Sequence, residues 1–325
     1  MDDRVTRRVL AGMVAAALCT SAPIAAAEVD ANTAPVVPDP PVTADDSADG
    51  DIAEDEITEP ATSASSRSKW LAAGGLATTY AAFSTYAYFA WFRGKQNGGD
   101  GFTFDGFGLH TYAGGADKLG HAWTAYALTR GTTAMLTHAG WSRLGSSVVA
   151  ASVSQIFFTL SEYEDSLVYQ FEVYDIVANV AGAAFAVAMV NLPTLDRWID
   201  LRLEYFPSKD YRRTVREDGN IDFFQDYSGQ SYMLALHLDA IPRMPRALQF
   251  VDVVAGFETR NYSPPRADES PPKTQRLYLG LTVNLQHLLG ELLPDSRGRR
   301  IAHGAFEYVS VPFTTWKAVD ASRSQ

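Results

Sequence analysis

The sequence predicts an α+β protein in which a four-helix bundle-like domain with a buried polar cluster precedes an antiparallel β region of about four strands. Three observations predict this order. Polar clusters interrupt long apolar stretches between residues 69 and 206, and their spacings of three and four residues place them on single helical faces. After residue 207, apolar and polar residues alternate with the period of a strand, and turn-rich breaks divide these runs.

The N-terminal 27 residues have the features of a signal peptide. Arg4, Arg7 and Arg8 form a basic region, residues 9–18 form an apolar one, and three alanines at 25–27 offer small residues for cleavage. We therefore expect an exported protein, either periplasmic or associated with the outer membrane of a Gram-negative bacterium.

The single cysteine, Cys19, lies within this segment and directly follows Leu18. A lipoprotein signal requires a small residue before the lipidated cysteine, so the sequence disfavours lipidation. Removal of the segment would leave no cysteine, and therefore no disulfide bond and no thiolate chemistry.

The segment 28–68 is predicted to be an acidic, disordered linker. Residues 28–66 carry 11 acidic side chains and no basic ones, among Pro, Ala, Thr and Ser. From Arg67 onward, 25 acidic and 24 basic side chains nearly balance, so the linker accounts for most of the formal net charge of −11. The folded part lacks the basic composition of nucleic-acid-binding domains, and we expect no nucleic-acid partner.

The predicted helical domain begins with 23 uncharged residues between Lys69 and Arg93. Their length fits a membrane span, and Trp70 at one end with Trp91 and Phe92 at the other fits an interfacial aromatic belt. A buried core helix fits as well, because Ser, Thr, Tyr and Trp make the stretch only moderately apolar. The sequence leaves both readings open.

Three further helices are predicted after a Gly-rich loop, over residues 116–138, 141–165 and 171–190. The last is rich in Ala and Gly, which let helix backbones approach closely, and Pro193 ends it.

Residues 195–206 predict a short amphipathic segment, which a basic cluster follows. The cluster consists of Lys209, Arg212, Arg213 and Arg216. It suits an anionic membrane surface, but it equally suits a solvated surface.

Four strands are predicted in the β region, over residues 232–238, 251–257, 277–285 and 302–316. The first three have one apolar and one polar face, as strands of outer-membrane barrels do, but four strands are too few to close such a barrel. They would either form an oligomer with other chains or form an open sheet whose apolar face covers the helices. The open sheet is the simpler arrangement, and we favour it.

The polar clusters are the candidate site. They consist of Asp117, Lys118 and His121 in the second helix, Glu162 and Asp165 in the third, and Asp175 and Asn179 in the fourth. Isolated buried charge is expensive, so these groups must be paired, metal-bound or protonated if the helices pack together. A structural network that fixes helix register explains them, and so does a binding or catalytic site.

Two chemistries could use these residues. A carboxyl group with a raised pKa beside His121 would suit general acid–base catalysis, with His121 and Glu162 as the catalytic pair. The imidazole and the carboxylates of Glu162, Asp165 and Asp175 also offer N and O ligands for a divalent cation, although no HExxH motif or paired histidines support zinc. The cofactor is therefore unknown from the residues alone.

The order of the clusters resembles that of the YfiM-like family of predicted periplasmic lipoproteins of unknown function, and more distantly that of VanZ-like membrane proteins. The resemblance rests on Asp117-Lys118-x-x-His121, an acidic helix end and Asp175-x-x-x-Asn179-x-x-Gly182, and it covers about residues 70–192. It implies a helical envelope domain whose signature positions include Glu162, Asp165 and Gly182, but it implies no activity. Two departures are the poor lipidation signal and Ser166, where a glycine is typical.

These observations lead us to expect an envelope protein with a membrane-associated domain that binds lipid or an envelope partner. A hydrolase or transferase acting on a lipid or cell-wall intermediate is the second expectation. A component of outer-membrane assembly, oligomeric through the β region, is the third.

Overall fold

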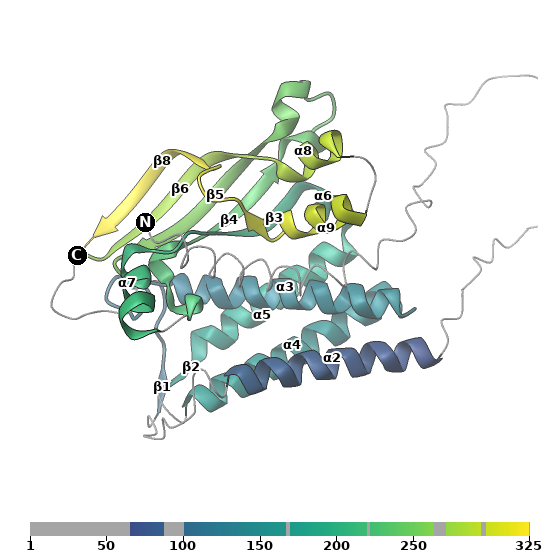
Figure 1. The fold of residues 1–325 in the computed structure, drawn as a ribbon, viewed down its shortest axis with the longest axis horizontal. Coiled ribbons are helices and arrows are strands. Elements are labelled where there is room, and N and C mark those ends of the chain that lie inside the picture. The colour runs from purple at the N-terminus through teal and green to yellow at the C-terminus, as the bar shows by residue number, and fades with distance from the viewer. Residues whose placement is uncertain are drawn as a thin grey trace, which may run out of the picture.

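The computed structural model describes residues 66–87, 101–166, 170–219, 222–262, 271–293 and 297–324. The predicted signal peptide and nearly all of the predicted linker lie outside these residues. The described part is α+β, as predicted: a layer of helices lies against a curved six-stranded sheet (Figure 1).

The helical layer contains four long helices: α2 Ser66–Ala87, α3 Ala116–His138, α4 Arg143–Ser166 and α5 Val173–Asn191. The last three confirm the predicted helices to within two residues at each end. α3 packs on both α4 and α5 and is the helix nearest the sheet, while α2 and α4 lie on the far side (Figure 1). Tyr80 of α2 packs on α4, where its ring meets Phe157 and its hydroxyl lies 3.1 Å from Ser154 Oγ.

Gly182 explains the close contact between α3 and α5. A Cβ at this position would lie 2.0 Å from the backbone oxygen of Ala122, so any side chain would force the two helices apart. Gly182 is therefore one of the small residues that were predicted to allow close helix packing, and it does so where α3 and α5 cross.

A two-stranded parallel ladder ties the Gly-rich loop to the start of α5. Strand β1 (Phe102–Thr103) pairs with β2 (Phe171–Glu172), and Phe102 lies opposite Phe171. The ladder fixes Glu172 one residue before α5, next to the first turn of α3.

The main sheet has the strand order β7-β3-β4-β5-β6-β8. Its strands are β3 Ile199–Tyr205, β4 Gln230–His237, β5 Val251–Arg260, β6 Thr274–Val283, β7 Val309–Ser310 and β8 Trp316–Ser324. The three predicted central strands are confirmed, but the expectation of about four antiparallel strands is only approximate, because the sheet has six and β7 runs parallel to β3.

Two segments differ from the predictions. The second half of the expected amphipathic segment is strand β3, which pairs along its whole length with β4. The expected strand over 302–316 is wrong: these residues form the second half of α9 (Arg297–Phe306), then β7, then a turn into β8. Apolar and polar residues alternate less regularly in this segment than in the other three predicted strands, and a helix does not require such alternation.

Short helices connect these strands. They are α6 Pro193–Trp198, α7 Lys209–Asp218, α8 Leu285–Leu292 and the 3-10 turns Phe223–Gln225, Tyr227–Gly229, Leu238–Ala240 and Arg246–Phe250. Asn284 ends β6 and begins α8, because its side chain accepts a hydrogen bond from the backbone N–H of His287.

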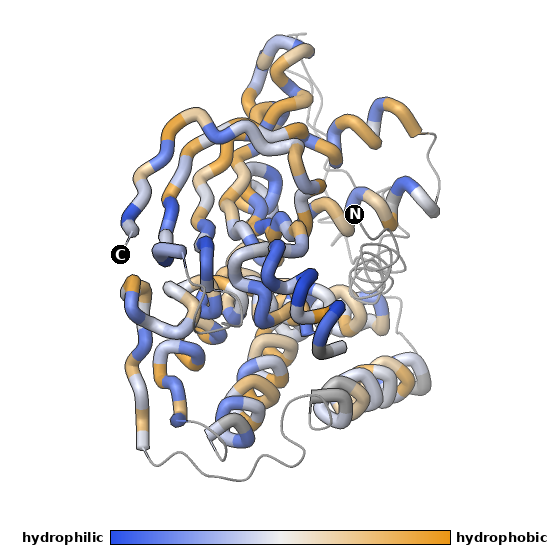
Figure 2. The backbone as a smooth tube through the Cα atoms, turned by 60° about the vertical axis from the view of Figure 1, so that its left-hand side comes forward, coloured by the Kyte–Doolittle hydropathy of each residue, from blue (hydrophilic) through white to orange (hydrophobic). Residues whose placement is uncertain are grey.

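The apolar face of the sheet points toward the helices, as predicted, but only part of it is covered. Tyr232 and Leu203 pack against Leu119 and Trp123 of α3. Over β6 and β8 the same face extends beyond the helices, and leucines there are exposed. Figure 2 shows hydrophobic residues both along the helices and along the strands.

The polar face of the sheet is the buried one. The segment between β7 and β8 crosses over this face, where Thr315 donates a hydrogen bond to Glu204 of β3 and contacts Thr282 of β6. Glu258 of β5 lies almost completely buried there and pairs with Lys317 of β8. The sheet therefore curls around its charged residues and leaves leucines outside.

Candidate functional site

The first polar cluster surrounds the ammonium group of Lys118, which is buried. Lys118 Nζ donates to Asp117 Oδ2 at 2.7 Å, lies 2.8 Å from Asp175 Oδ1 and also contacts Glu172 Oε1. Burial alone would lower the pKa of Lys118, but the charges of Asp117 and Asp175 outweigh it and raise that pKa. The lysine is therefore a resident cation that holds α3 to the start of α5.

Glu172 belongs to this cluster, and the sequence analysis did not identify it. Burial and the nearby Asp175 carboxylate raise the pKa of Glu172 to about 7. Its position three residues before Asp175 was a signal that could have found it, since that spacing is one helical turn.

His121 lies one turn along α3 from Asp117 and faces both neighbouring helices. Its Nδ1 lies 3.6 Å from Glu162 Oε1 and 3.3 Å from Asn179 Oδ1, while its Nε2 lies 3.7 Å from Asp175 Oδ1. Both distances to carboxylates exceed a normal hydrogen bond. The histidine side chain is 28% exposed, so this side of the cluster opens to the surroundings.

Asn179 is completely buried, and its amide Nδ2 finds no hydrogen-bond partner among the described residues. Such an orphaned donor is costly and rare in a buried position. Because the two ends of an amide are assigned rather than observed, the unpartnered atom can equally be the oxygen. The amide therefore retains a capacity for one more interaction beside His121.

The structure thus brings together Asp117, Lys118, His121, Glu162, Asp175 and Asn179, all of which were predicted site residues. Asp165 lies in the last turn of α4, but its side chain is outside the described residues. Gly182 lies two turns of α5 away from Asp175 and acts in helix packing, not in the cluster.

Two groups in the cluster have the spacing of metal ligands. One consists of His121, Glu162 and Asp175, and the other of Asp117, Glu172 and Asp175; in each, three ligand atoms lie within 4.8 Å of one another. In the second group the Lys118 ammonium contacts all three carboxylates, where a metal ion would otherwise bind. In the first group the Lys118 ammonium contacts Asp175.

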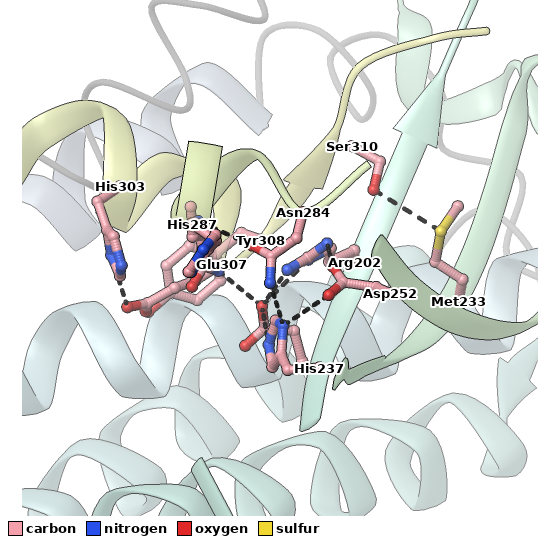
Figure 3. A network of polar contacts seen from close by, with 12 residues as sticks. Arg202, Met233, His237, Asp252, Asn284, His287, His303, Glu307, Tyr308 and Ser310 are labelled. Carbon is pink, nitrogen blue, oxygen red and sulfur yellow. Dashed lines mark hydrogen bonds and ion pairs between the residues drawn. The ribbon is translucent and has the colours of Figure 1, made fainter. Parts of the chain in front are cut away.

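The curled sheet holds a second buried polar network that the sequence analysis missed (Figure 3). Arg202 Nη1 donates to Asp252 Oδ2 at 2.8 Å, and Arg202 Nη2 donates to Asp200 Oδ2 at 2.6 Å. His237 lies between the same two carboxylates, 3.0 Å from each. The available signal was the position of these charges on alternate strand residues opposite the leucines.

The charges of this network balance. Burial alone would lower the pKa of His237, but hydrogen bonds to Asp200 and Asp252 raise it to about 10. Burial alone would raise the pKa of Asp200, but Arg202 and His237 lower it. Two carboxylates therefore face one guanidinium and one imidazolium, which is the pattern of a structural network.

A cavity of about 590 Å³ lies beside this network, between α6, α8 and α9. Its acidic lining residues are largely satisfied within the protein: Asp196 and Glu307 bind Arg130, and Asp239 pairs with His287. This pairing favours a structural role for the lining.

Comparison with known protein families gives a match over the segment that contains α3, α4 and α5. Residues 105–191 match the family described as "Predicted periplasmic lipoprotein (DUF2279)". Neither the search of curated proteins nor the search of solved structures gave a match. The more distant similarity to VanZ-like membrane proteins stays an expectation.

The matched residues run from the Gly-rich loop to the end of α5 and include every member of the helical polar cluster. The family description confirms the expected exported, periplasmic location. Residues 105–191 are therefore similar to this periplasmic family of unknown function.

Proposed function

We propose that this protein is a membrane-associated envelope domain that binds lipid through the outer face of its helical layer. One observation carries the proposal. The apolar stretches Arg143–Glu164 and Val173–Asn191 are long and apolar enough to cross a membrane, yet only 28% and 33% of them are buried within the protein. The core helix of a water-soluble domain is expected to bury a larger share.

The exposed side chains of α4 form an apolar surface along the helix. Leu144 and Val148 lie one turn apart near its start, and Ile156 and Leu160 lie one turn apart near its end, with the exposed Ser152 between the two pairs. Ile156 is 62% exposed and Leu160 is 58% exposed. Contiguous apolar surface of this kind marks an interaction or membrane surface.

Exposed aromatic rings lie at both ends of the helical layer. Trp70 and Trp141 are exposed at one end, and Phe104, Tyr163 and Tyr174 are exposed at the other. This distribution matches the aromatic belts found where membrane proteins meet the two polar interfaces of a bilayer.

The polar cluster lies at the depth of one such interface. His121 is five residues from the start of α3, and Glu162 is four residues from the end of α4, which places both about 6–8 Å from the helix ends at a rise of about 1.5 Å per residue. Lipid headgroups would lie at that depth. The basic helix α7 packs beside the first turns of α3 through Tyr211, so its charges would face anionic headgroups.

An apolar cavity adds a place for an acyl chain. It has a volume of about 490 Å³ and lies between α3 and the uncovered apolar face of the sheet. Its lining includes Leu119, Leu234, Leu277, Leu279 and Val319.

A flotation assay tests the proposal. Full-length protein purified in mild detergent is mixed with vesicles of phosphatidylethanolamine and phosphatidylglycerol, the detergent is removed, and the fraction that floats with the vesicles is measured. Leu160→Lys is expected to reduce binding about tenfold or more, since a charge within the apolar region costs up to about 3 kcal/mol.

Leu292→Lys is the matched control, because Leu292 is a leucine on α8, outside the helical layer, that is at least as exposed as Leu160. Binding by Leu292→Lys should equal that of wild type. Wild-type protein that stays in the soluble fraction, or equal binding by the two variants, would reject the proposal and favour a protein partner.

A second candidate function is acid–base catalysis on a lipid or cell-wall intermediate. It is favoured by the position of His121 between the carboxylates of Glu162 and Asp175 on the open side of the cluster. Conversion of envelope lipids by wild type, lost in His121→Gln and kept in His138→Gln on the same helix, would support it. The third candidate, an outer-membrane assembly component, is favoured by the exposed leucines of β6 and would require an oligomer on cross-linking.

A further inference from the structure

We propose that His121, Glu162 and Asp175 bind one divalent transition-metal ion, with the side-chain amide of Asn179 as a fourth donor. The site lies where α3, α4 and α5 meet, and each helix contributes at least one ligand. This inference does not depend on membrane binding.

The separations of the ligand atoms fit a metal ion. One ring nitrogen of His121 and one oxygen each of Glu162 and Asp175 lie within 4.8 Å of one another. Two ligands of a tetrahedral ion with bonds of about 2.1 Å lie roughly 3.4 Å apart. Small side-chain rotations would bring the three atoms to this spacing around one ion.

The buried amide of Asn179 is an independent indication. Asn179 is fully buried, points at His121 and leaves one amide atom without a partner among the described residues. An amide oxygen turned toward the ion would complete the donor set. In the present arrangement Oδ1 lies 3.3 Å from His121 Nδ1, and Nδ2 is the atom without a partner.

Within the described part of the chain, one ammonium serves several carboxyl groups of the cluster. Lys118 contacts Asp117, Glu172 and Asp175 together. A divalent ion bound by Asp175 and Glu162 would add positive charge beside these carboxyl groups, which is a physical reason for binding.

The donor set indicates the class of ion. One imidazole, two carboxylates and an amide oxygen are intermediate between the nitrogen-rich sites of copper or nickel and the all-oxygen sites of calcium and magnesium. Zn²⁺ and Mn²⁺ are therefore the ions to use as probes, and Ca²⁺ should bind more weakly.

The test measures metal binding on the full chain, carried without a histidine tag. Protein in mild detergent is stripped with a chelator, dialysed against Zn²⁺ or Mn²⁺ and analysed for bound metal, and its thermal unfolding is followed with and without each ion. Wild type is expected to hold one equivalent and to melt at a higher temperature with the ion. Glu162→Gln and His121→Gln should bind at least tenfold more weakly.

Two matched controls come from the same helices. Glu164→Gln changes an exposed carboxylate on α4, and His138→Gln changes an exposed histidine on α3. Both should bind the ion as wild type does. Absence of a stoichiometric ion in wild type, or equal retention by Glu162→Gln, would overturn the proposal.

Asn179→Asp tests the metal site even if the variants that remove a ligand, Glu162→Gln and His121→Gln, fold poorly. The new carboxylate should tighten binding and increase the ion-induced rise in melting temperature above that of wild type. If this variant folds but responds to Zn²⁺ and Mn²⁺ no more than wild type, Asn179 is not a ligand. If wild type does not respond to the ions either, the metal site itself is excluded.

Discussion

The two buried polar clusters of this protein differ in how completely they satisfy their own charges. In the sheet, Arg202 and a protonated His237 face two carboxylates, and every distance is that of a hydrogen bond or close ion pair. In the helices, the described carboxyl groups of Asp117, Glu172 and Asp175 share the ammonium of Lys118, and His121 lies beyond hydrogen-bond distance of both carboxylates it faces.

A balanced network contributes to a unique fold, whereas an unbalanced one has capacity left for a ligand. The difference identifies the helical cluster as the functional candidate, although the sheet network is better buried and lies next to the larger cavity. Substitutions in the sheet network should therefore lower stability strongly. Substitutions in the helical cluster should change stability little and abolish the response to metal ions.

The largest effect is expected for Arg202→Met in the sheet network. Loss of the guanidinium leaves two buried carboxylates with His237 as their only cation, which should lower the free energy of unfolding by about 3–5 kcal/mol. Guanidinium denaturation in mild detergent measures it. The control is Arg276→Met at a half-exposed ion pair, where a loss of comparable size would contradict the expected contrast.

The second effect is a pH dependence caused by His237. The folded state raises the pKa of His237 to about 10, above the ordinary value near 6.5 in the unfolded chain. The folded state holds the proton more tightly, so this stabilisation is complete below about pH 6.5 and is lost as the pH rises through about 10.

Denaturation at several pH values between 6 and 10 measures that dependence. Wild type should lose stability with rising pH more steeply than His237→Gln, by up to a few kcal/mol over this interval. Equal slopes in the two proteins would show that His237 is neutral in the folded state.

A smaller loss is expected for Gly182→Ala at the crossing of α3 and α5. The added methyl group meets the backbone of Ala122, which cannot move as a side-chain end can, so the variant should lose about 1–3 kcal/mol. Gly74→Ala on α2 has open space around it and should be neutral or slightly stabilising. Thermal unfolding of both variants makes the comparison, and equal melting temperatures would contradict the close packing.

The smallest effect on stability is expected for Glu162→Gln. Removing the Glu162 carboxylate relieves its repulsion with the nearby Asp175, so the free energy of unfolding should change by less than about 1 kcal/mol or increase. The rise in melting temperature on adding Zn²⁺ or Mn²⁺ should disappear at the same time. A large loss of stability, with no ion response in wild type, would assign Glu162 to a structural network like that of the sheet.

The sequence by itself determined the helices α3, α4 and α5, the three central strands and most members of the helical cluster. Helical and strand periods are local, and residues three or four apart on a helix share a face whatever the rest of the fold does. The same reasoning identified His121, Glu162, Asp175 and Asn179 before their contacts were known.

Only the tertiary structure decided which of these charges meet and how completely they are paired. Lys118 pairs with Glu172 across 54 positions of sequence, and Arg202 pairs with Asp252 across 50. The burial of the polar face of the sheet depends on β7 joining β3 in parallel, which no local pattern encodes. Charge balance is a property of a packed cluster, because desolvation and Coulomb attraction act between side chains that the chain brings together only when it folds.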